Sequence, residues 1–217
     1  MPIMAKRLQL TFDDGPEPVA SLNTILDELK VRKVSAAFFL LGKEANLNPS
    51  ALNSIIQAGH TLGNHSWDHL EPHTERFTDV QIQTQFRDTH NKVLDLTNVQ
   101  MNHWRAPRGE QLDRLKNLLT DTGNLYTFSH CDWHADSRDC QGAKSAAEML
   151  KAIRNDIAKQ PTTRPMIRLL FHITANTAAA LKQVLDGLIS DGHMLENFSQ
   201  TSFAPEMKLN SDNISKE

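Results

Sequence analysis

Seven short apolar runs alternate with helical patterns along the chain, and this alternation restricts the possible folds more than any other feature. It is typical of a parallel sheet with crossover helices, either closed into a barrel or open. The predicted strands are 8–12, 34–41, 60–64, 101–105, 125–129, 166–171 and 193–196. The predicted helices are 19–30, 49–58, 78–96, 110–122, 143–160 and 177–190.

The length and charge of the chain exclude several classes of protein. Its 217 residues fit one domain, which we assign to residues 1–204, with a polar tail over 205–217. The formal net charge of -3 provides no electrostatic footprint for nucleic acid or an anionic membrane. No stretch approaches the roughly 18 apolar residues of a membrane span. We expect no nucleic-acid partner, no membrane insertion and a monomer.

The cellular location stays open at this point. Residues 1–7 lead into the first predicted strand without a secretory signal pattern. The protein is therefore either extracytoplasmic (periplasmic or secreted) in a mature or trimmed form, or cytoplasmic. Cys131 and Cys140 do not decide between these, because two cysteines this close in sequence can bridge a short loop or remain free thiols.

Polar residues that could take part in catalysis or metal binding follow the ends of the predicted strands. The carboxyl ends of parallel strands meet at one edge of the sheet, so residues far apart in sequence should converge there. They are Asp13 and Asp14 after the first strand, His65 and His69 after the third, Arg105 at the end of the fourth, Asp136 and Asp139 in the loop after the fifth, and His172 at the end of the sixth.

The segment HSWDH, with His65 and His69 four residues apart, suggests a metal site. Two histidines at this spacing can share one face of a helical turn. Together with one carboxylate of Asp13-Asp14 they match the catalytic zinc pattern of three protein ligands and an open position. An isolated HxxxH is more often a pair of surface or core histidines, but Asp-Asp-Gly-Pro at a strand end favours the metal. If Asp14 binds the ion, Asp13 is free to act as general base and His172 as general acid in a hydrolysis.

These motifs resemble those of the polysaccharide deacetylases with NodB homology, carbohydrate esterase family 4. The resemblance runs from about residue 8 to residue 198. Five family motifs occur in order, namely TFDDGP, HSWDH, RAPRG, DSRDC and LLFH. The third motif departs from the usual Arg-Pro-Pro-Tyr, and the fourth ends at Cys140 where the family usually has Trp.

The resemblance implies a distorted (β/α)7 barrel with its active site at the C-terminal ends of the strands. It implies one divalent metal ion, zinc first, with cobalt, nickel or manganese as alternatives. The roles it implies are Asp13 as catalytic base, Arg105 as the arginine that orients it, Asp14, His65 and His69 as metal ligands, and Asp139 as the carboxylate that tunes the acid, His172.

Expected substrate contacts are less specific. The resemblance implies that the backbone N–H of Arg108 faces the oxyanion and that Leu170 lies near the acetyl methyl group, although Leu170 could equally be a core strand residue. Trp67 and Trp133 either line a sugar subsite or belong to the core. Cys140 is far smaller than tryptophan, so this wall of the cleft is either missing or supplied by another ring. His73 is more often a solvated loop residue than a fourth metal ligand.

The resulting hypothesis is a metal-dependent deacetylase of N-acetylglucosamine-containing polysaccharide, peptidoglycan or a chitin-type glycan, which releases acetate. Two enzymatic alternatives stay open, a small-molecule amidase of the same superfamily and an acetylxylan esterase. A third alternative is a catalytically inactive glycan-binding module. Such a module is expected to lose the base or a metal ligand, whereas this chain retains them all.

Overall fold

The structure is a computed structural model that describes residues 5–70, 77–110, 112–121 and 129–198. Most of the strand expected over 125–129 lies outside these residues, as do His73 and the expected boundary between residues 204 and 205. The elements and contacts of the fold described below belong to these residues.

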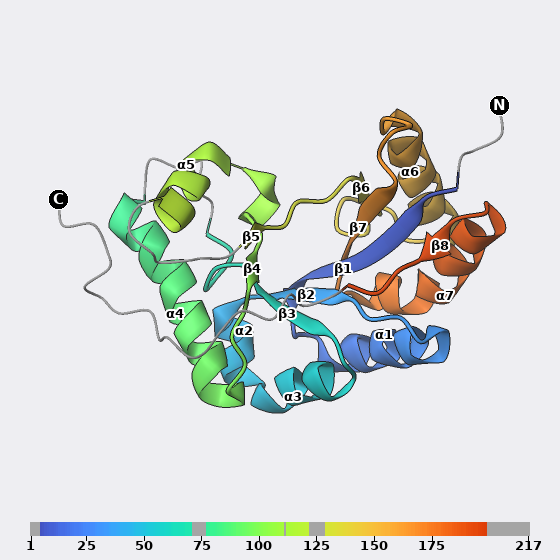
Figure 1. The fold of residues 1–217 in the computed structure, drawn as a ribbon. Helices are drawn as coiled ribbons and strands as arrows, with labels where there is room; N and C mark the ends of the chain where they lie inside the picture. Colours follow the sequence, from blue (N-terminus) through green and yellow to red (C-terminus); the bar gives the residue numbers. More distant parts are fainter. Residues whose placement is uncertain (1–4, 71–76, 111, 122–128, 199–217) are drawn as a thin grey trace.

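A curled parallel sheet forms the centre of the fold (Figure 1). Its strands follow the order β5-β4-β3-β2-β1-β7-β6, and β8 pairs with β1 beside this path. Every pairing is parallel, which confirms the predicted α/β class. The strands are β1 (Arg7–Gly15), β2 (Ala37–Leu40), β3 (Thr61–Asn64), β4 (His103–Trp104), β5 (Ser129–His130), β6 (Ala135–Asp136), β7 (Met166–His172) and β8 (Met194–Leu195).

Helices lie along the outside of the curled sheet (Figure 1). Two of them begin with a complete capping box, formed by Thr78 with Gln81 and by Ser145 with Glu148, in which side chain and backbone satisfy each other's groups. The helices are α1 (Val19–Arg32), α2 (Gly42–Leu47), α3 (Pro49–Gln57), α4 (Asp79–Thr97), α5 (Leu112–Lys116), α6 (Ala146–Lys159) and α7 (Ala175–Ser190), with a 3-10 turn at Pro107–Gly109 and a π-helical turn at Asn117–Asp121.

Side chains on the two faces of the central strands have different surroundings, because successive side chains of a strand point to opposite faces. On β1, the residues Leu8, Leu10 and Phe12 are fully buried against the outer helices. The ring of Phe12 stacks on Phe38 at 5.0 Å and on Phe171 at 5.6 Å between centroids. Truncating such a buried ring typically costs about 3–5 kcal/mol of stability. The alternate residues of β1 are left to face the inside of the curled sheet.

The structure corrects the expected elements at three places. Residues 135–136, assigned to a loop, form β6 and pair with Leu169 and Leu170 of β7. Helix α2 was not expected, and the helix expected over 110–122 is divided into α5 and the π-helical turn. A two-residue strand is too short to show any periodicity in sequence, so only its pairing with β7 reveals it.

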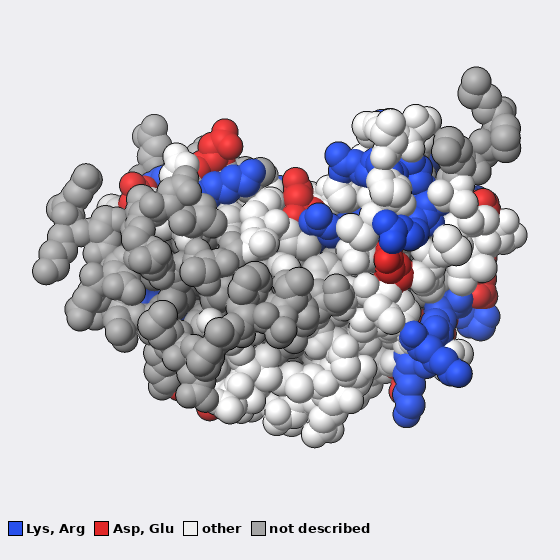
Figure 2. Space-filling model, viewed as in Figure 1, with Lys and Arg blue, Asp and Glu red and all other residues white. Residues whose placement is uncertain are grey.

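The exposed surface carries charges of both signs. Figure 2 shows Lys and Arg side chains gathered beside acidic ones on the side of the molecule where α6 and α7 lie. Arg154 pairs with Asp191 at 2.7 Å, and Arg7 pairs with Glu196 at 3.0 Å. Such exposed pairs contribute little, roughly 0–1 kcal/mol each. Within the described part of the chain, no helix has the length and apolar character needed to cross a membrane.

Three histidines support the sheet as hydrogen-bond acceptors. The Nδ1 atoms of His193, His60 and His134 accept from the backbone N–H groups of Lys6 (3.1 Å), Ala36 (3.1 Å) and Arg168 (2.9 Å). An imidazolium has no acceptor nitrogen, so each ring must be neutral. Burial lowers the pKa of His60 and, with help from nearby arginines, of His134 to about 4, and it also lowers the pKa of His193.

Acid should therefore destabilise the fold as the unfolded chain takes up protons on these histidines. The folded-state pKa of His60, about 4, lies below its ordinary value of 6.5, so the unfolded chain takes up the proton first. The stability that neutral His60 contributes is complete above pH 6.5 and is lost as the pH falls from 6.5 to about 4. His60→Asn keeps an acceptor for the Ala36 N–H but cannot titrate. Urea unfolding at several pH values gives the slope of the unfolding free energy against pH. In the variant this slope should be lower than in the wild type by up to about 1.4 kcal/mol per pH unit in this window. An unchanged slope would contradict the assignment.

Candidate active site

The adjacent carboxylates of Asp13 and Asp14 reach the same cleft because β1 is bulged there. Phe12 pairs with Phe38 and Gly15 pairs with Leu40, so β1 has one residue more than β2 over this interval. Asp14 has a φ of 64°, in the left-handed region. In a regular strand the two side chains would point to opposite faces, and the bulge removes that alternation. Both carboxylates therefore line one cavity.

Asp13 is a buried carboxylate paired with a buried arginine. Its side chain is 4% exposed and that of Arg105 is 0% exposed, and Arg105 Nη1 donates to Asp13 Oδ1 at 2.6 Å. Burial raises the pKa of Asp13, although the charges of Arg105 and His172 favour its ionised form. Asp13 is also in register with His172 of β7, so both side chains emerge on the same face of the sheet.

Arg105 is held on several sides. Its Nε donates to the carbonyl oxygen of Cys131 at 2.8 Å, and its Nη1 also donates to Thr11 Oγ1 at 2.9 Å. The guanidinium lies over the ring of Phe39, 4.1 Å from its centroid. These contacts leave Arg105 little freedom, so the direction in which Asp13 points is determined by the fold.

Asp14, His65 and His69 form a cluster suited to a metal ion. The Nε2 atoms of His65 and His69 lie 3.5 and 3.6 Å from Asp14 Oδ1. His65 Nδ1 lies 3.0 Å from the carbonyl oxygen of Arg105, to which it can only donate, so the Nε2 lone pair faces Asp14. Burial lowers the pKa of His65 to about 3, which keeps the ring neutral. Asp14 Oδ1 is buried and accepts no hydrogen bond from the described residues. The donor set therefore fits a divalent cation.

The two histidines do not meet on a helical turn, as their spacing suggested. Residues 65–70 form an irregular turn in which Ser66 and His69 have φ values of 72° and 60°. Asn64 Oδ1 accepts from the Ser66 N–H at 2.9 Å. Gln85 of α4 accepts from the Trp67 N–H at 2.9 Å and from the next N–H at 3.1 Å. Side-chain acceptors thus replace the helical hydrogen bonds of this turn.

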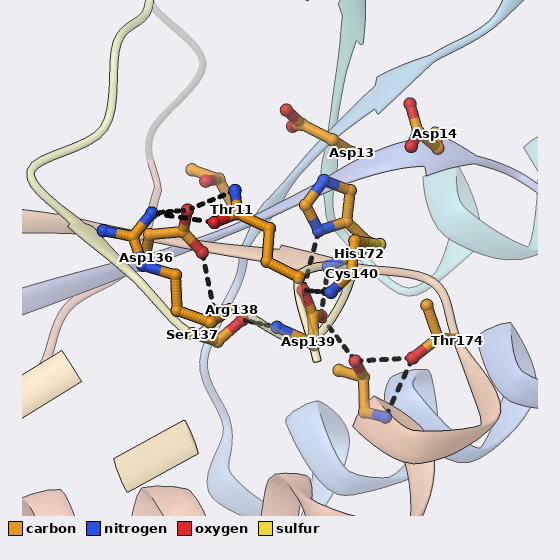
Figure 3. A network of polar contacts seen from close by, with 12 residues as sticks. Thr11, Asp13, Asp14, Asp136, Ser137, Arg138, Asp139, Cys140, His172 and Thr174 are labelled. Carbon is orange, nitrogen blue, oxygen red and sulfur yellow. Dashed lines mark hydrogen bonds and ion pairs between the residues drawn. The ribbon is translucent and has the colours of Figure 1, made fainter. Parts of the chain in front are cut away.

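His172 and Asp139 form a second charged pair, and His172 lines the same cavity as Asp14, His65 and His69. His172 Nδ1 and Asp139 Oδ1 are 2.7 Å apart (Figure 3). Asp139 also accepts from the backbone N–H groups of His172 and Cys140, at 2.7 and 2.9 Å, and from Thr177 Oγ1 at 2.5 Å. Burial would raise the pKa of Asp139, but the hydrogen bonds from His172 and Thr177 outweigh it and lower the pKa. Asp139 is therefore a carboxylate.

The imidazole of His172 is in turn held in its protonated form. Burial by itself lowers the pKa of His172, whereas hydrogen bonds to Asp139 and Cys140 and the negative charge of Asp13 raise it to about 11. A ring in this state has a proton to donate toward the cleft. Thr177 was not expected from the sequence, and its only signal is the N-capping pattern that it shares with Thr174 at the start of α7.

Asp136 supports the turn that carries Asp139. Its carboxylate accepts from the Arg138 backbone N–H and from Arg138 Nη1, both at 2.7 Å, and Arg138 Nη2 reaches Asp156 of α6 at 3.1 Å (Figure 3). Arg138 has a φ of 62°. These contacts stabilise a tight turn between β6 and α6, and through it the position of Asp139.

The expected substrate contacts converge on a cavity of about 500 Å³, with one exception. It is lined by Asp13, Asp14, His65, His69, Arg108, Glu110, Trp133, Asp136, Cys140, Gln141, Leu170 and His172. Trp67 instead lines a separate cavity of about 280 Å³ beside α4, and its ring packs against Gly42 of α2. A cavity of about 730 Å³ near Lys30 and His60 contains none of the proposed chemical groups.

Trp133 contacts the third motif directly. Gly109 has a φ of 68°, and a Cβ at this position would lie 2.6 Å from the Trp133 ring. The preceding residue, Arg108, has a φ of 56°. Cys131 is buried and Cys140 is exposed, and both are free thiols rather than a disulfide. The aromatic ring that lines this part of the cleft is therefore Trp133, and Cys140 lines the same cavity.

Comparisons with known proteins agree with this arrangement. A family model described as "Polysaccharide deacetylase" matches residues 3–127. The chain is 29% identical over 195 residues to the peptidoglycan-N-acetylmuramic acid deacetylase PdaC of Bacillus subtilis, covering 90% of this chain and 38% of that protein. It is 30% identical over 188 residues to the peptidoglycan-N-acetylglucosamine deacetylase PgdA of Listeria monocytogenes, covering 87% and 37%. The chain thus spans less than two fifths of the length of these curated relatives.

Solved structures share the fold. A family 4 carbohydrate esterase from Streptomyces lividans in complex with acetate superposes with a TM-score of 0.73 at 26% identity, covering 93% of this chain and 98% of that one. A mutant of a CE4 family pseudoenzyme with restored enzymatic activity gives 0.75 at 25% identity, covering 90% and 66%. The expected distorted (β/α)7 barrel is confirmed by this likeness, with its curled sheet left open between β5 and β6. The chain belongs to the polysaccharide deacetylase family.

Proposed function

We propose that the protein hydrolyses the acetamido groups of N-acetylglucosamine in peptidoglycan or a chitin-type glycan and releases acetate. One observation carries the proposal. A single cleft places the Asp14, His65 and His69 cluster beside a buried carboxylate, Asp13, and a protonated imidazole, His172. Together these groups can promote the attack of water on an amide and protonate the departing nitrogen.

Asp14, His65 and His69 would hold the divalent ion, with zinc as the first candidate. When bound, such an ion supplies Lewis acidity that polarises a carbonyl and makes water more acidic. The neutral ring of His65 and the unshared Oδ1 of Asp14 suit this task. Cobalt, nickel or manganese could replace zinc, since nitrogen and oxygen ligands accept each of them.

Asp13 acts as the general base in this proposal. Its Oδ1 is occupied by Arg105 at 2.6 Å, so the other oxygen is the one that takes the proton from water. The ionised form that the base requires is favoured by Arg105 and by any cation held at Asp14. Arg105 has no contact with the substrate in this scheme and serves to orient Asp13.

His172 acts as the general acid. The Asp139 carboxylate fixes Nδ1 of the ring, which leaves Nε2 as the nitrogen that delivers a proton to the leaving amine. Leu170, buried and in the same cavity, offers an apolar surface for the acetyl methyl group. The backbone N–H of Arg108 and the ring of Trp133 are the proposed contacts for the oxyanion and for a sugar face.

The substrate and the location are linked. Both curated relatives described above are peptidoglycan deacetylases by name, and peptidoglycan lies outside the cytoplasmic membrane. The proposed substrate therefore favours an extracytoplasmic protein. A cytoplasmic location would instead favour the alternative of a small-molecule amidase, and acetylxylan esterase activity would require an O-acetyl substrate. The inactive-module alternative is weakened because Asp13, the metal cluster and His172 are all retained.

The roles of Asp13 and Asp14 are separable by mutation. Asp13→Asn should retain the bound ion and lower the rate of turnover by roughly 10²–10⁴-fold, because the amide cannot accept the proton. Asp14→Ala should lose the ion, as measured by elemental analysis after dialysis. The reverse pattern would mean that the roles of these residues are exchanged. Stoichiometric metal in neither wild type nor variants, with activity unaffected by a chelator, would exclude the metal site.

The contact between Thr177 and Asp139 should contribute to stability and to turnover. Thr177→Val removes one donor from a buried carboxylate, which typically costs about 1–3 kcal/mol. Thr177→Ser keeps the hydroxyl and is the matched control. Urea unfolding should rank the valine variant below the serine variant, and kcat should fall more than KM changes. Equal stability of the two variants would show that the hydroxyl contact is unimportant.

A glycan panel tests the reaction itself. We expect acetate release from peptidoglycan fragments or from N-acetylglucosamine oligomers with zinc or cobalt present, and none from the Asp13→Asn variant. Release from acetylxylan alone, or from a small cyclic or linear amide alone, would replace the proposal with the corresponding alternative. Binding of the oligomers by the zinc-loaded protein with no acetate release from any substrate would favour the inactive module.

A further inference from the structure

A second group of metal-ligating side chains lies in the same cleft, apart from the Asp14 cluster. Asp139, Cys140 and His172 each offer one ligand atom, and these atoms lie within 4.8 Å of one another. Figure 3 shows Cys140 and Asp139 beside the ring of His172. Cys140 is exposed and lines the cavity, so a cation entering the cleft can reach its thiol.

The chemistry of this group selects a particular class of ion. A thiolate, an imidazole and a carboxylate together favour zinc and softer divalent cations, whereas magnesium and calcium prefer oxygen ligands. We propose that Asp139, Cys140 and His172 form a second, weaker site for a soft divalent cation such as Zn²⁺ or Cd²⁺. Three protein ligands leave a further position for water, as at other open sites.

Binding at this site displaces protons and involves no redox change. The Cys140 thiol gives up its proton to form the metal–sulfur bond, and the His172 ring gives up one proton to free a nitrogen lone pair. The Asp139 carboxylate adds the third bond. The 2.7 Å contact between Asp139 and His172 must open somewhat if both of its atoms bind the ion, because each metal–ligand distance is about 2.0–2.2 Å. Losing this hydrogen bond makes the second site weaker than the first.

The consequence for turnover rests on the proposed function, whereas the binding does not. A His172 ring that has exchanged its proton for a metal bond cannot protonate a leaving amine. Zinc in excess of one equivalent should therefore inhibit deacetylation, and magnesium should not. The inhibition depends on Cys140, since tryptophan, the usual family residue at this position, offers no metal ligand.

Cadmium titration of the protein tests the binding without an activity assay. The wild type should bind two ions by equilibrium dialysis, and the second should bring a thiolate-to-cadmium absorption band in the ultraviolet. Cys140→Ser should bind one ion and lose the band. Cys131→Ser is the matched control, because its thiol is buried beside Arg105, and it should retain both ions and the band.

Two further variants separate this site from its rivals. His65→Ala should lose one ion yet keep the absorption band, which places the thiolate outside the first site. His172→Asn should weaken the second ion by about tenfold or more, as expected when a metal-site residue is lost. A single bound ion in the wild type, a band that survives in Cys140→Ser, or unaltered affinity in His172→Asn would overturn the proposal. Two bound ions, with no acetate release even when only one equivalent of zinc is present, would retain this site and reject the proposed function.

Discussion

The ion pair between Asp13 and Arg105 is the interaction on which the rest of the site depends. Arg105 follows β4 and Asp13 lies near the end of β1, with β3 and β2 between these strands, so the pair spans the inside of the curled sheet. Two buried charges are costly to desolvate, and the cost is offset only where further hydrogen bonds complete the arrangement. Thr11 and the Cys131 carbonyl supply those bonds. Removing either charge would leave the other buried and unpaired, at about 3–5 kcal/mol.

Neighbouring ionisable groups in this cleft differ in their protonation because their surroundings differ. Asp139 is stabilised as an anion by four hydrogen bonds, whereas burial raises the pKa of Asp13 despite its arginine partner. His65 is kept neutral by burial, and His172 is kept protonated by its carboxylate neighbours. In the proposed mechanism, aspartate and histidine side chains thus serve as ligand, base, acid and support. Environment rather than residue identity assigns the tasks.

The sequence predicts the parts of this site that lie in short contiguous motifs. Asp-Asp-Gly-Pro, HSWDH and the histidine that ends β7 are all local patterns at strand ends, and the topology of a parallel sheet brings them together. The same reasoning missed what depends on distant partners. The HSWDH turn is shaped by Gln85, which belongs to a helix well downstream, and β6 exists only through its pairing with β7. In the sequence, Trp67 and Trp133 both lie beside motif residues and cannot be told apart. Only the packing of Trp67 against Gly42 shows that it lines a different cavity.

Because of its bulge, β1 contributes carboxylates to both halves of the cleft. The half proposed to bind a cation lies toward β3. The half proposed to donate a proton lies with β6, β7 and the start of α7, and Asp13 and Asp14 lie between them. Evolutionary drift can therefore act on the halves separately. A change confined to the turn before α6 would disturb the residues that support His172 and leave the Asp14, His65 and His69 cluster in place. Under the proposed mechanism, such a change would remove the general acid while the candidate metal ligands stayed in position.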